Sequence, residues 1–179
     1  MSQRFTLRSF ATAEPEACVT VSVEIGASWV LEYRVNGIDS LEWPGPVAQP
    51  TRRDGLWHHT CGECFVADPS GSGYLEFNFS PSGDWAAYRF ADVRRDMRQH
   101  EWPGPSPQSE QIAMGAWRVI LPVQALGYAG SSAVRRRIGL SVVARGARGH
   151  SYWALHHPGA QPNFHDPAGF IASLEVPGP

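Results

Sequence analysis

The sequence contains no lysine, because all 15 of its basic residues are arginines. This absence excludes Schiff-base chemistry on a lysine and phosphate binding by a P-loop lysine. Charge is also nearly balanced, since 17 acidic residues in 179 leave a net charge of -2. A chain so close to neutral lacks the basic surface of a general nucleic-acid binder or of a protein that binds anionic membranes. We therefore expect neither nucleic acid nor a membrane as a partner.

Cysteine and long apolar runs are scarce as well. Three cysteines are an odd number, which excludes a complete set of intrachain disulfides and favours a reducing compartment. The first 21 residues hold no apolar core of the length that a signal peptide needs, and no run of 18 apolar residues occurs anywhere. These absences predict a cytoplasmic location.

What the sequence does have is apolar residues that alternate with polar ones. The alternation is clearest at 18–25 and 29–35, and it predicts half-buried strands. Further strands are expected at 60–67, 73–80, 85–90, 116–122, 137–144 and 151–156. Loops are expected at 44–54, 92–111 and 158–169, with one short helical turn within 124–132. The pattern predicts one all-β domain over 1–179, an antiparallel β-sandwich whose topology stays open between jelly-roll and immunoglobulin-like.

The segment 54–90 carries the most chemical information. In the predicted strand at 73–80, one row of side chains holds Glu76 and Asn78, and the opposite row is apolar: Leu75, Phe77 and Phe79. Glu63 shares a row with an aromatic residue in the preceding strand, and Arg89 shares a row with a small alanine in the following one. If these polar rows share a face, that face holds two acids, an amide and an arginine.

Such a face has two interpretations. Sugar hydroxyls pair with carboxylates, amides and guanidinium groups, and the apolar face of a pyranose packs on flat aromatic rings, so the pattern favours carbohydrate binding. The alternative is an open sheet that carries an arginine–glutamate ion pair, while the seven tryptophans fill the core.

Three motifs carry a family resemblance. They are DxLWxxTCxExF from position 54, YLEFNFSPSGxWAxYRF from position 74, and SYWALHHP followed by PNFHDP from position 151. With these motifs the chain, from about Phe5 to Leu174, resembles the bacterial DOMON-like ligand-binding domains, which are related to carbohydrate-binding modules of family 9. The resemblance implies a jelly-roll-like β-sandwich that binds sugar or haem on a concave sheet face.

The resemblance also implies site residues. Trp57 and Glu63 match the W-x5-E spacing of a stacking aromatic and a sugar-binding acid in family 9. Arg89 matches the sugar-binding arginine, and Trp153 is the candidate for a second stacking tryptophan. The complete predicted ligand-binding set adds polar contacts and two histidines at the rim: Glu76, Asn78, His156 and His165. The calcium sites of the family have no acidic cluster here to match.

Metal and haem sites find less support. Cys61 and Cys64 form a CxxC, but on a strand they point to opposite faces, which favours buried structural cysteines. Some DOMON relatives bind b-type haem through methionine and histidine, and Met114 with His156 is the pair that could do so here. No CxxCH is present, which excludes covalent c-type haem. We predict no metal and no resident cofactor, with a haem or redox module as the alternative.

Catalysis and protein binding complete the alternatives. Neither a GxSxG nor an HExxH motif occurs in the sequence. Glu63 and Glu76 could lie close together on neighbouring strands, but no nucleophile or leaving-group arrangement for glycoside hydrolysis is recognisable around them. The sequence therefore predicts a non-catalytic module for a small ligand, most simply a carbohydrate. The competing class is an interaction domain that uses its proline-rich segments, 44–54 and 101–107.

Overall fold

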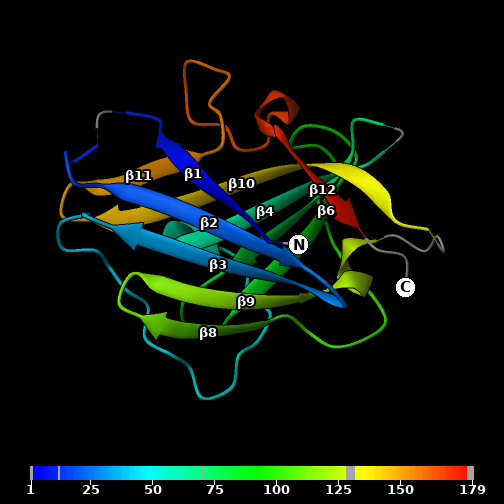
Figure 1. Ribbon diagram of the computed structural model, residues 1–179, viewed down its shortest axis with the longest axis horizontal. Coiled ribbons are helices and arrows are strands. Elements are labelled where there is room, and N and C mark those ends of the chain that lie inside the picture. The colour runs from blue at the N-terminus through cyan, green and yellow to red at the C-terminus, as the bar shows by residue number, and fades with distance from the viewer. Residues whose placement is uncertain (1, 12, 70, 128–131, 177–179) are drawn as a thin grey trace.

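Twelve strands make up most of the regular structure in the computed structural model, which describes residues 2–11, 13–69, 71–127 and 132–176 (Figure 1). They are β1 (Ser2–Ser9), β2 (Cys18–Ile25), β3 (Ser28–Asn36), β4 (Cys61–Ala67), β5 (Tyr74–Phe79), β6 (Trp85–Phe90), β7 (Arg98–Gln99), β8 (Gln108–Ala113), β9 (Ala116–Pro122), β10 (Val134–Gly146), β11 (Gly149–Ala154) and β12 (Ala172–Val176). Three short 3-10 turns join them: η1 (Leu56–His58), η2 (Val123–Leu126) and η3 (Pro167–Gly169). The all-β prediction is confirmed.

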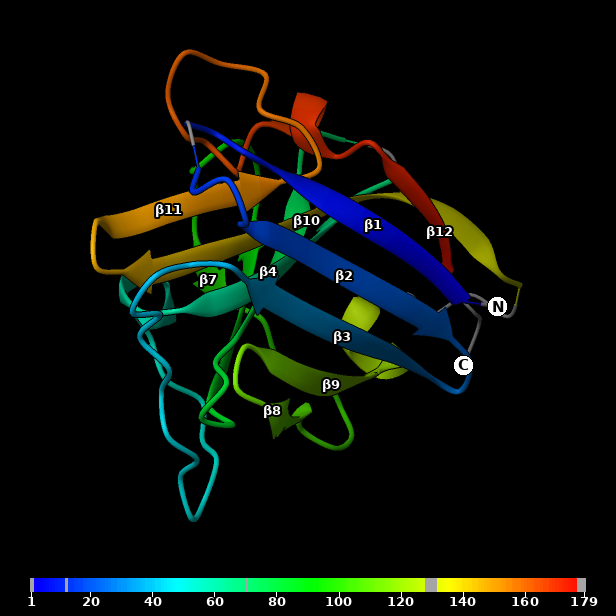
Figure 2. The same cartoon turned by 60° about the vertical axis from the view of Figure 1, so that its left-hand side comes forward.

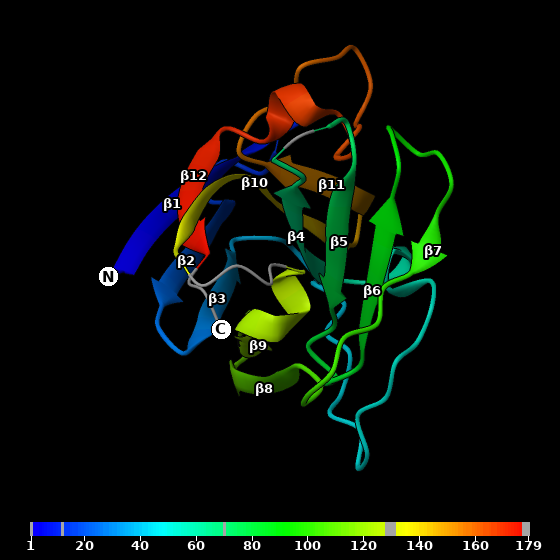
Figure 3. The same ribbon diagram turned by 90° about the vertical axis from the view of Figure 1, so that its right-hand side faces the viewer.

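The strands form two layers that share a seam. One layer runs β8-β9-β3-β2-β1 and the other runs β7-β6-β5-β4-β10-β11, with β12 beside β10. Figure 3 shows β4, β5 and β6 facing β2, β3 and β9 across the molecule. Strand β1 belongs to both layers, because Ser2–Leu7 pairs with β2, whereas Arg8 and Ser9 pair with β11 (Figure 2). Every pairing between named strands is antiparallel, as a sandwich of this kind requires.

Strands with a clear alternation were predicted well, and polar ones were missed. The predicted ranges for β2, β6 and β9 coincide with the observed bounds. The prediction of a loop throughout 92–111 is wrong, because β7 and the first four residues of β8 lie there. Strand β8 was missed because all six of its residues, QSEQIA, are partly or fully exposed and four of them are polar, so no apolar row marks it. The predicted helical turn at 124–132 overlaps η2, and positions 128–131 lie outside the described residues.

The main core fills the space between the layers. It is built from the inward rows of both sheets, including the fully buried Trp29, Tyr33 and Trp117 on one side and Phe77 and Phe79 on the other. The sheets come close at Gly62, where an added Cβ would stand 2.7 Å from the Tyr33 and Trp117 rings. Among the described residues, no helix has the length and apolarity to cross a membrane.

A second apolar cluster covers the outward face of β4, β5 and β6. Its members come from these strands, from the segment around η1 and from the loop before β12: Leu56, Cys61, Phe65, Ala67, Tyr74, Ala86, Tyr88, Phe90 and Phe170, with Trp57 and Phe164 packed against them. These central strands are therefore covered on both faces, which explains why almost every residue in them is buried. The candidate site lies within this outer layer.

Candidate functional site

A cavity of about 510 Å³ opens over the outward face of the second sheet. Strands β4, β5, β6, β10 and β11 supply its floor, and the segments around 57, 94 and 164 supply its rim. Its lining combines aromatic rings, two acids and several basic groups: Trp57, His58, Glu63, Glu76, Tyr88, Phe90, Arg94, Met97, Val143, His150, Tyr152, Pro162, Phe164 and His165. A volume of this order suits a small organic molecule.

Two buried glutamates lie at the floor of this cavity. Glu63 on β4 is opposite Asn78 on β5, and Glu76 lies two residues before Asn78 in the same row. The two acids are therefore diagonal neighbours on one face, at a Cβ separation of about 7 Å or less. Each is only 4% exposed.

The carboxyl groups are partly satisfied by neutral side chains. Ser141 Oγ donates to Glu63 Oε2 at 2.9 Å, and Asn78 Nδ2 donates to Glu76 Oε1 at 2.8 Å. Asn78 is fully buried, and its Oδ1 has no hydrogen-bond partner among the described residues. These hydrogen bonds hold both carboxyl groups in place, and the Asn78 Oδ1 beside them can still accept a hydrogen bond.

His165 brings the loop after β11 back to these acids. Its Nδ1 lies 2.8 Å from the Tyr74 hydroxyl and 3.7 Å from Glu76 Oε2. The Tyr74 oxygen also accepts a hydrogen bond from the backbone N–H of Arg94 at 3.2 Å. The Tyr74 oxygen can accept from Arg94 while its hydroxyl proton is donated to Nδ1, an arrangement that corresponds to a neutral imidazole protonated on Nε2.

Arg94 lies at the rim of the cavity and has an unusual backbone conformation. Its φ of 53° lies in the left-handed region, which costs a non-glycine residue free energy. The Tyr74 contact and a hydrogen bond from Arg94 Nε to Asn163 Oδ1 at 3.2 Å hold the loop in place. Arg94 thereby joins the β6–β7 connection to the loop that carries His165.

Burial shifts the pKa values of the three titratable groups at the floor. Burial and the nearby Glu76 carboxylate raise the pKa of Glu63 to about 8, and burial raises the pKa of Glu76 to about 7. Arg94 and the hydrogen bonds from Ser141 and Asn78 oppose these rises. Burial, together with Arg94, lowers the pKa of His165 to about 4. The floor thus favours neutral acids and a neutral imidazole.

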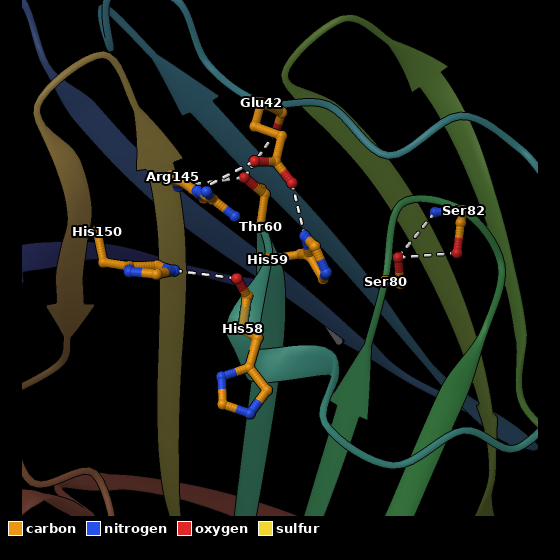
Figure 4. A network of polar contacts seen from close by, with 8 residues as sticks. All are labelled: Glu42, His58, His59, Thr60, Ser80, Ser82, Arg145 and His150. Atoms are coloured by element: carbon orange, nitrogen blue, oxygen red, sulfur yellow. Dashed lines mark hydrogen bonds and ion pairs between the residues drawn. The ribbon is translucent and has the colours of Figure 1, made fainter.

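A polar network holds the rim around η1 (Figure 4). Glu42 accepts from His59 Nδ1 at 2.6 Å and pairs with Arg145 Nε at 3.1 Å, while its backbone carbonyl accepts from Thr60 Oγ1. His150 Nε2 lies 3.0 Å from the backbone oxygen of His58. These contacts tie the segment around η1 to the neighbouring strands β10 and β11 and so position the cavity rim.

The prediction that Arg89 shares a face with Glu63 and Asn78 is wrong. In the β5–β6 register, Leu75 is opposite Arg89 and Glu76 is opposite Tyr88, so Arg89 belongs to the inward row. There it forms an ion pair with Asp68 at 3.3 Å, with its side chain 44% exposed. Tyr88 takes the place on the cavity face that the sequence interpretation gave to Arg89, and its hydroxyl donates to Asp54 at 2.5 Å.

The predicted role of Trp153 as a stacking residue at the site does not fit its position. Trp153 is 3% exposed and belongs to the main core, with Nε1 donating to Ser151 Oγ. Its neighbour Tyr152 points the other way and lines the cavity. His156 is exposed and borders a separate void of about 10 Å³, outside the cavity.

Four of the predicted residues, Trp57, Glu63, Glu76 and His165, do line the cavity, and Asn78 bonds to one of them. Sequence reasoning missed the remaining lining residues. Strand parity places His150 and Tyr152 in one row of β11. This row could have been identified as part of the site if the side of the strand that faces the cavity had been known. Arg94 carries no such signal, because it lies in a loop.

The cysteines and the haem candidates have also been located. Cys61 and Cys64 are both buried, in the outer and main clusters respectively, so the expected opposite orientation is confirmed. Met114 is 74% exposed in the turn between β8 and β9, and it does not line the cavity. The structure does not bring Met114 and His156 together at this site.

No protein-family model matches this chain, and no curated protein matches it. Comparison with solved structures finds a candidate carbohydrate-binding protein from Bacteroides uniformis ATCC 8492. The two share 15% sequence identity with a TM-score of 0.68, over 97% of this chain and 85% of the other. At this identity the likeness establishes a shared fold.

Proposed function

We propose that the chain is a non-catalytic module that binds a small polar ligand, of the carbohydrate class, in the cavity on the outward face of the second sheet. The observation that carries the proposal is the lining itself. Five aromatic rings stand around two buried acids, and this combination suits a molecule with apolar faces and hydroxyl edges: Trp57, Tyr88, Phe90, Tyr152 and Phe164 around Glu63 and Glu76.

Two further findings support this proposal. The Bacteroides uniformis structure, which shares the fold, is described as that of a carbohydrate-binding protein candidate. The W-x5-E spacing of the family 9 resemblance falls on Trp57 and Glu63, and both residues line the cavity. In this proposal Trp57 stacks on a sugar face, while Glu63, Glu76 and His165 bind its edge.

Trp57 gives the direct test. It is half-buried at the rim, and its ring packs edge-on against Tyr88 at 6.2 Å. Replacing it in Trp57→Ala removes stacking surface, so we expect binding of a monosaccharide found by calorimetric screening to weaken by at least about tenfold. The thermal midpoint should change little, because Trp57 lies outside the main core.

A matched control is Trp102→Ala, which removes another half-buried tryptophan in the predicted contact segment 101–107. This variant should keep its affinity. Equal affinities of wild type and Trp57→Ala, or no binding across the screen, would overturn the proposal. The alternatives have their own readouts: a Soret band in the purified protein for a haem module, and a partner-dependent solution mass for an interaction domain.

A further inference from the structure

The acids at the cavity floor have few direct polar partners, and the charge of Arg94 acts on both of them. Glu63 accepts one hydrogen bond, from the Ser141 hydroxyl to Oε2, and its Oε1 accepts none among the described residues. Glu76 is bonded to the Asn78 amide, with the imidazole of His165 at 3.7 Å. Within the described ranges, no arginine forms an ion pair with either acid. The one arginine in the lining, Arg94, is exposed and donates from Nε to Asn163.

Burying two acids without a directly paired cation is costly in an apolar layer. Separating a carboxylate from water requires an opposite charge or several donors to offset the lost solvation. Glu63 and Glu76 face the same cavity with one such donor each, and each remains nearly inaccessible to solvent. A ligand that supplies positive charge and N–H donors would complete their coordination.

The walls favour the same kind of ligand. Five aromatic rings surround the acids, and aromatic faces attract ammonium groups electrostatically. The acids at the floor and the aromatic rings at the walls are thus two independent features of one cavity. A neutral ligand could contact both, but it would form neither an ion pair with the acids nor a cation–π contact with the rings.

We infer that the ligand presents a protonated nitrogen to Glu63 and Glu76, so that amino sugars are preferred over their hydroxyl counterparts. The inference rests on the proposed function and narrows its ligand class. An ammonium group can donate to the free Glu63 Oε1 and to Glu76 at once, and charge-assisted bonds of this kind are about twice as strong as neutral ones.

Matched ligands test the inference by titration calorimetry at pH 7, where the 2-amino group of the sugar is protonated. Glucose, galactose and mannose are each compared with the 2-amino sugar and with its N-acetyl form, in which the charge is removed. For at least one of the three sugars, the protonated 2-amino form should bind about tenfold or more tightly than both the parent sugar and the N-acetyl form. If the neutral members bind as tightly as the amines, the inference is overturned while the proposed function stands. If no sugar of any form binds, the proposed function itself is overturned.

Substitution of the acids gives the second arm. Glu63→Gln keeps the shape of the side chain and should fold, because burial already favours the neutral acid. The preference for the amine over the matched neutral sugar should fall by about tenfold in this variant. Glu110→Gln, which removes the same charge from an exposed position on β8, should retain the full preference. An unchanged preference in Glu63→Gln would overturn the inference.

Proton release is a third readout. Binding a cation should ionise the acids, so amine affinity should rise from pH 6 to pH 7, where the ligand stays protonated, with protons released to the buffer. Other groups face the acids from the surrounding elements and must be kept constant in these comparisons: Tyr74, Tyr88 with Asp54, His58, Arg94, His150, Tyr152 and His165. Binding without proton release at pH 7 would overturn the inference.

Discussion

Removing the titratable proton of Glu63 should change how stability depends on pH. The side chain is 4% exposed, and burial raises its pKa from 4.5 in an exposed chain to about 8 in the folded protein. A raised pKa means that the folded chain keeps a proton that the unfolded chain loses. The stability contribution of Glu63 is therefore present below about pH 4.5 and is lost as the pH rises toward about 8. Glutamine in Glu63→Gln has no proton to lose.

The size of the effect follows from the proton count. Where one proton separates the folded from the unfolded state, the free energy of unfolding falls by about 1.4 kcal/mol for each pH unit. Between pH 5 and pH 7 the wild type should therefore lose about 3 kcal/mol relative to Glu63→Gln. His165 has the opposite sign, because its lowered pKa makes stability rise with pH between about 4 and 6.5, but it contributes to both proteins and cancels in the difference.

Urea unfolding followed by tryptophan fluorescence, at half-unit steps from pH 5 to pH 8, measures this difference. The Glu63→Gln curve should diverge upward from the wild-type curve as the pH rises. Glu110→Gln, with an exposed carboxyl on β8, should give a curve parallel to that of the wild type. Parallel curves for Glu63→Gln and the wild type would refute the reasoning, since they would show that Glu63 titrates alike in both states.

Three other substitutions test the assignment of residues to the core or to the cavity. Trp153→Ala should lower the free energy of unfolding by about 3–5 kcal/mol, because the ring is buried in the main core; a loss below 1 kcal/mol in urea titration would be inconsistent with this placement. Arg89→Gln should leave calorimetric sugar affinity within about twofold of the wild type, since Arg89 lies on the inward row; a tenfold loss would place it in the site after all. Gly62→Ala should cost about 1–3 kcal/mol, because its methyl group would stand 2.7 Å from the Tyr33 and Trp117 rings; a thermal midpoint equal to that of the wild type would contradict the close sheet contact.

Most of the sandwich could be predicted from alternation alone. Strands with one apolar row, such as β2 and β9, were predicted to their exact bounds, because each buries that row against the other sheet. Strands β1 and β12 were missed, although the alternating burial of β12 is clear once its partner β10 is known. Their sequences are too short or too polar for a periodic signal to stand out.

The site could be predicted only in part. Alternation shows which side chains of a strand lie on the same side, but it does not show whether that side faces the core or the cavity. Glu76 and Asn78 share a row by parity, and Glu63 joins them through the register with β5. Whether Arg89 or its neighbour Tyr88 joins the same face depends on the length of the β5–β6 turn, where a shift of one residue exchanges the two rows. On β11 the family resemblance pointed to Trp153, whereas its neighbour Tyr152, in the opposite row, lines the cavity.

The seam formed by β1 has a mechanical consequence for the cavity. Arg8 and Ser9 pair with β11, and the next residue, Phe10, donates its N–H to the carbonyl of Tyr152 at 2.9 Å. The β11 wall of the cavity is therefore hydrogen-bonded to β1, which also pairs with β2. Displacement of β1 would therefore act on the backbone of Tyr152 and on the cavity wall that this residue lines, more than a hundred residues further along the sequence.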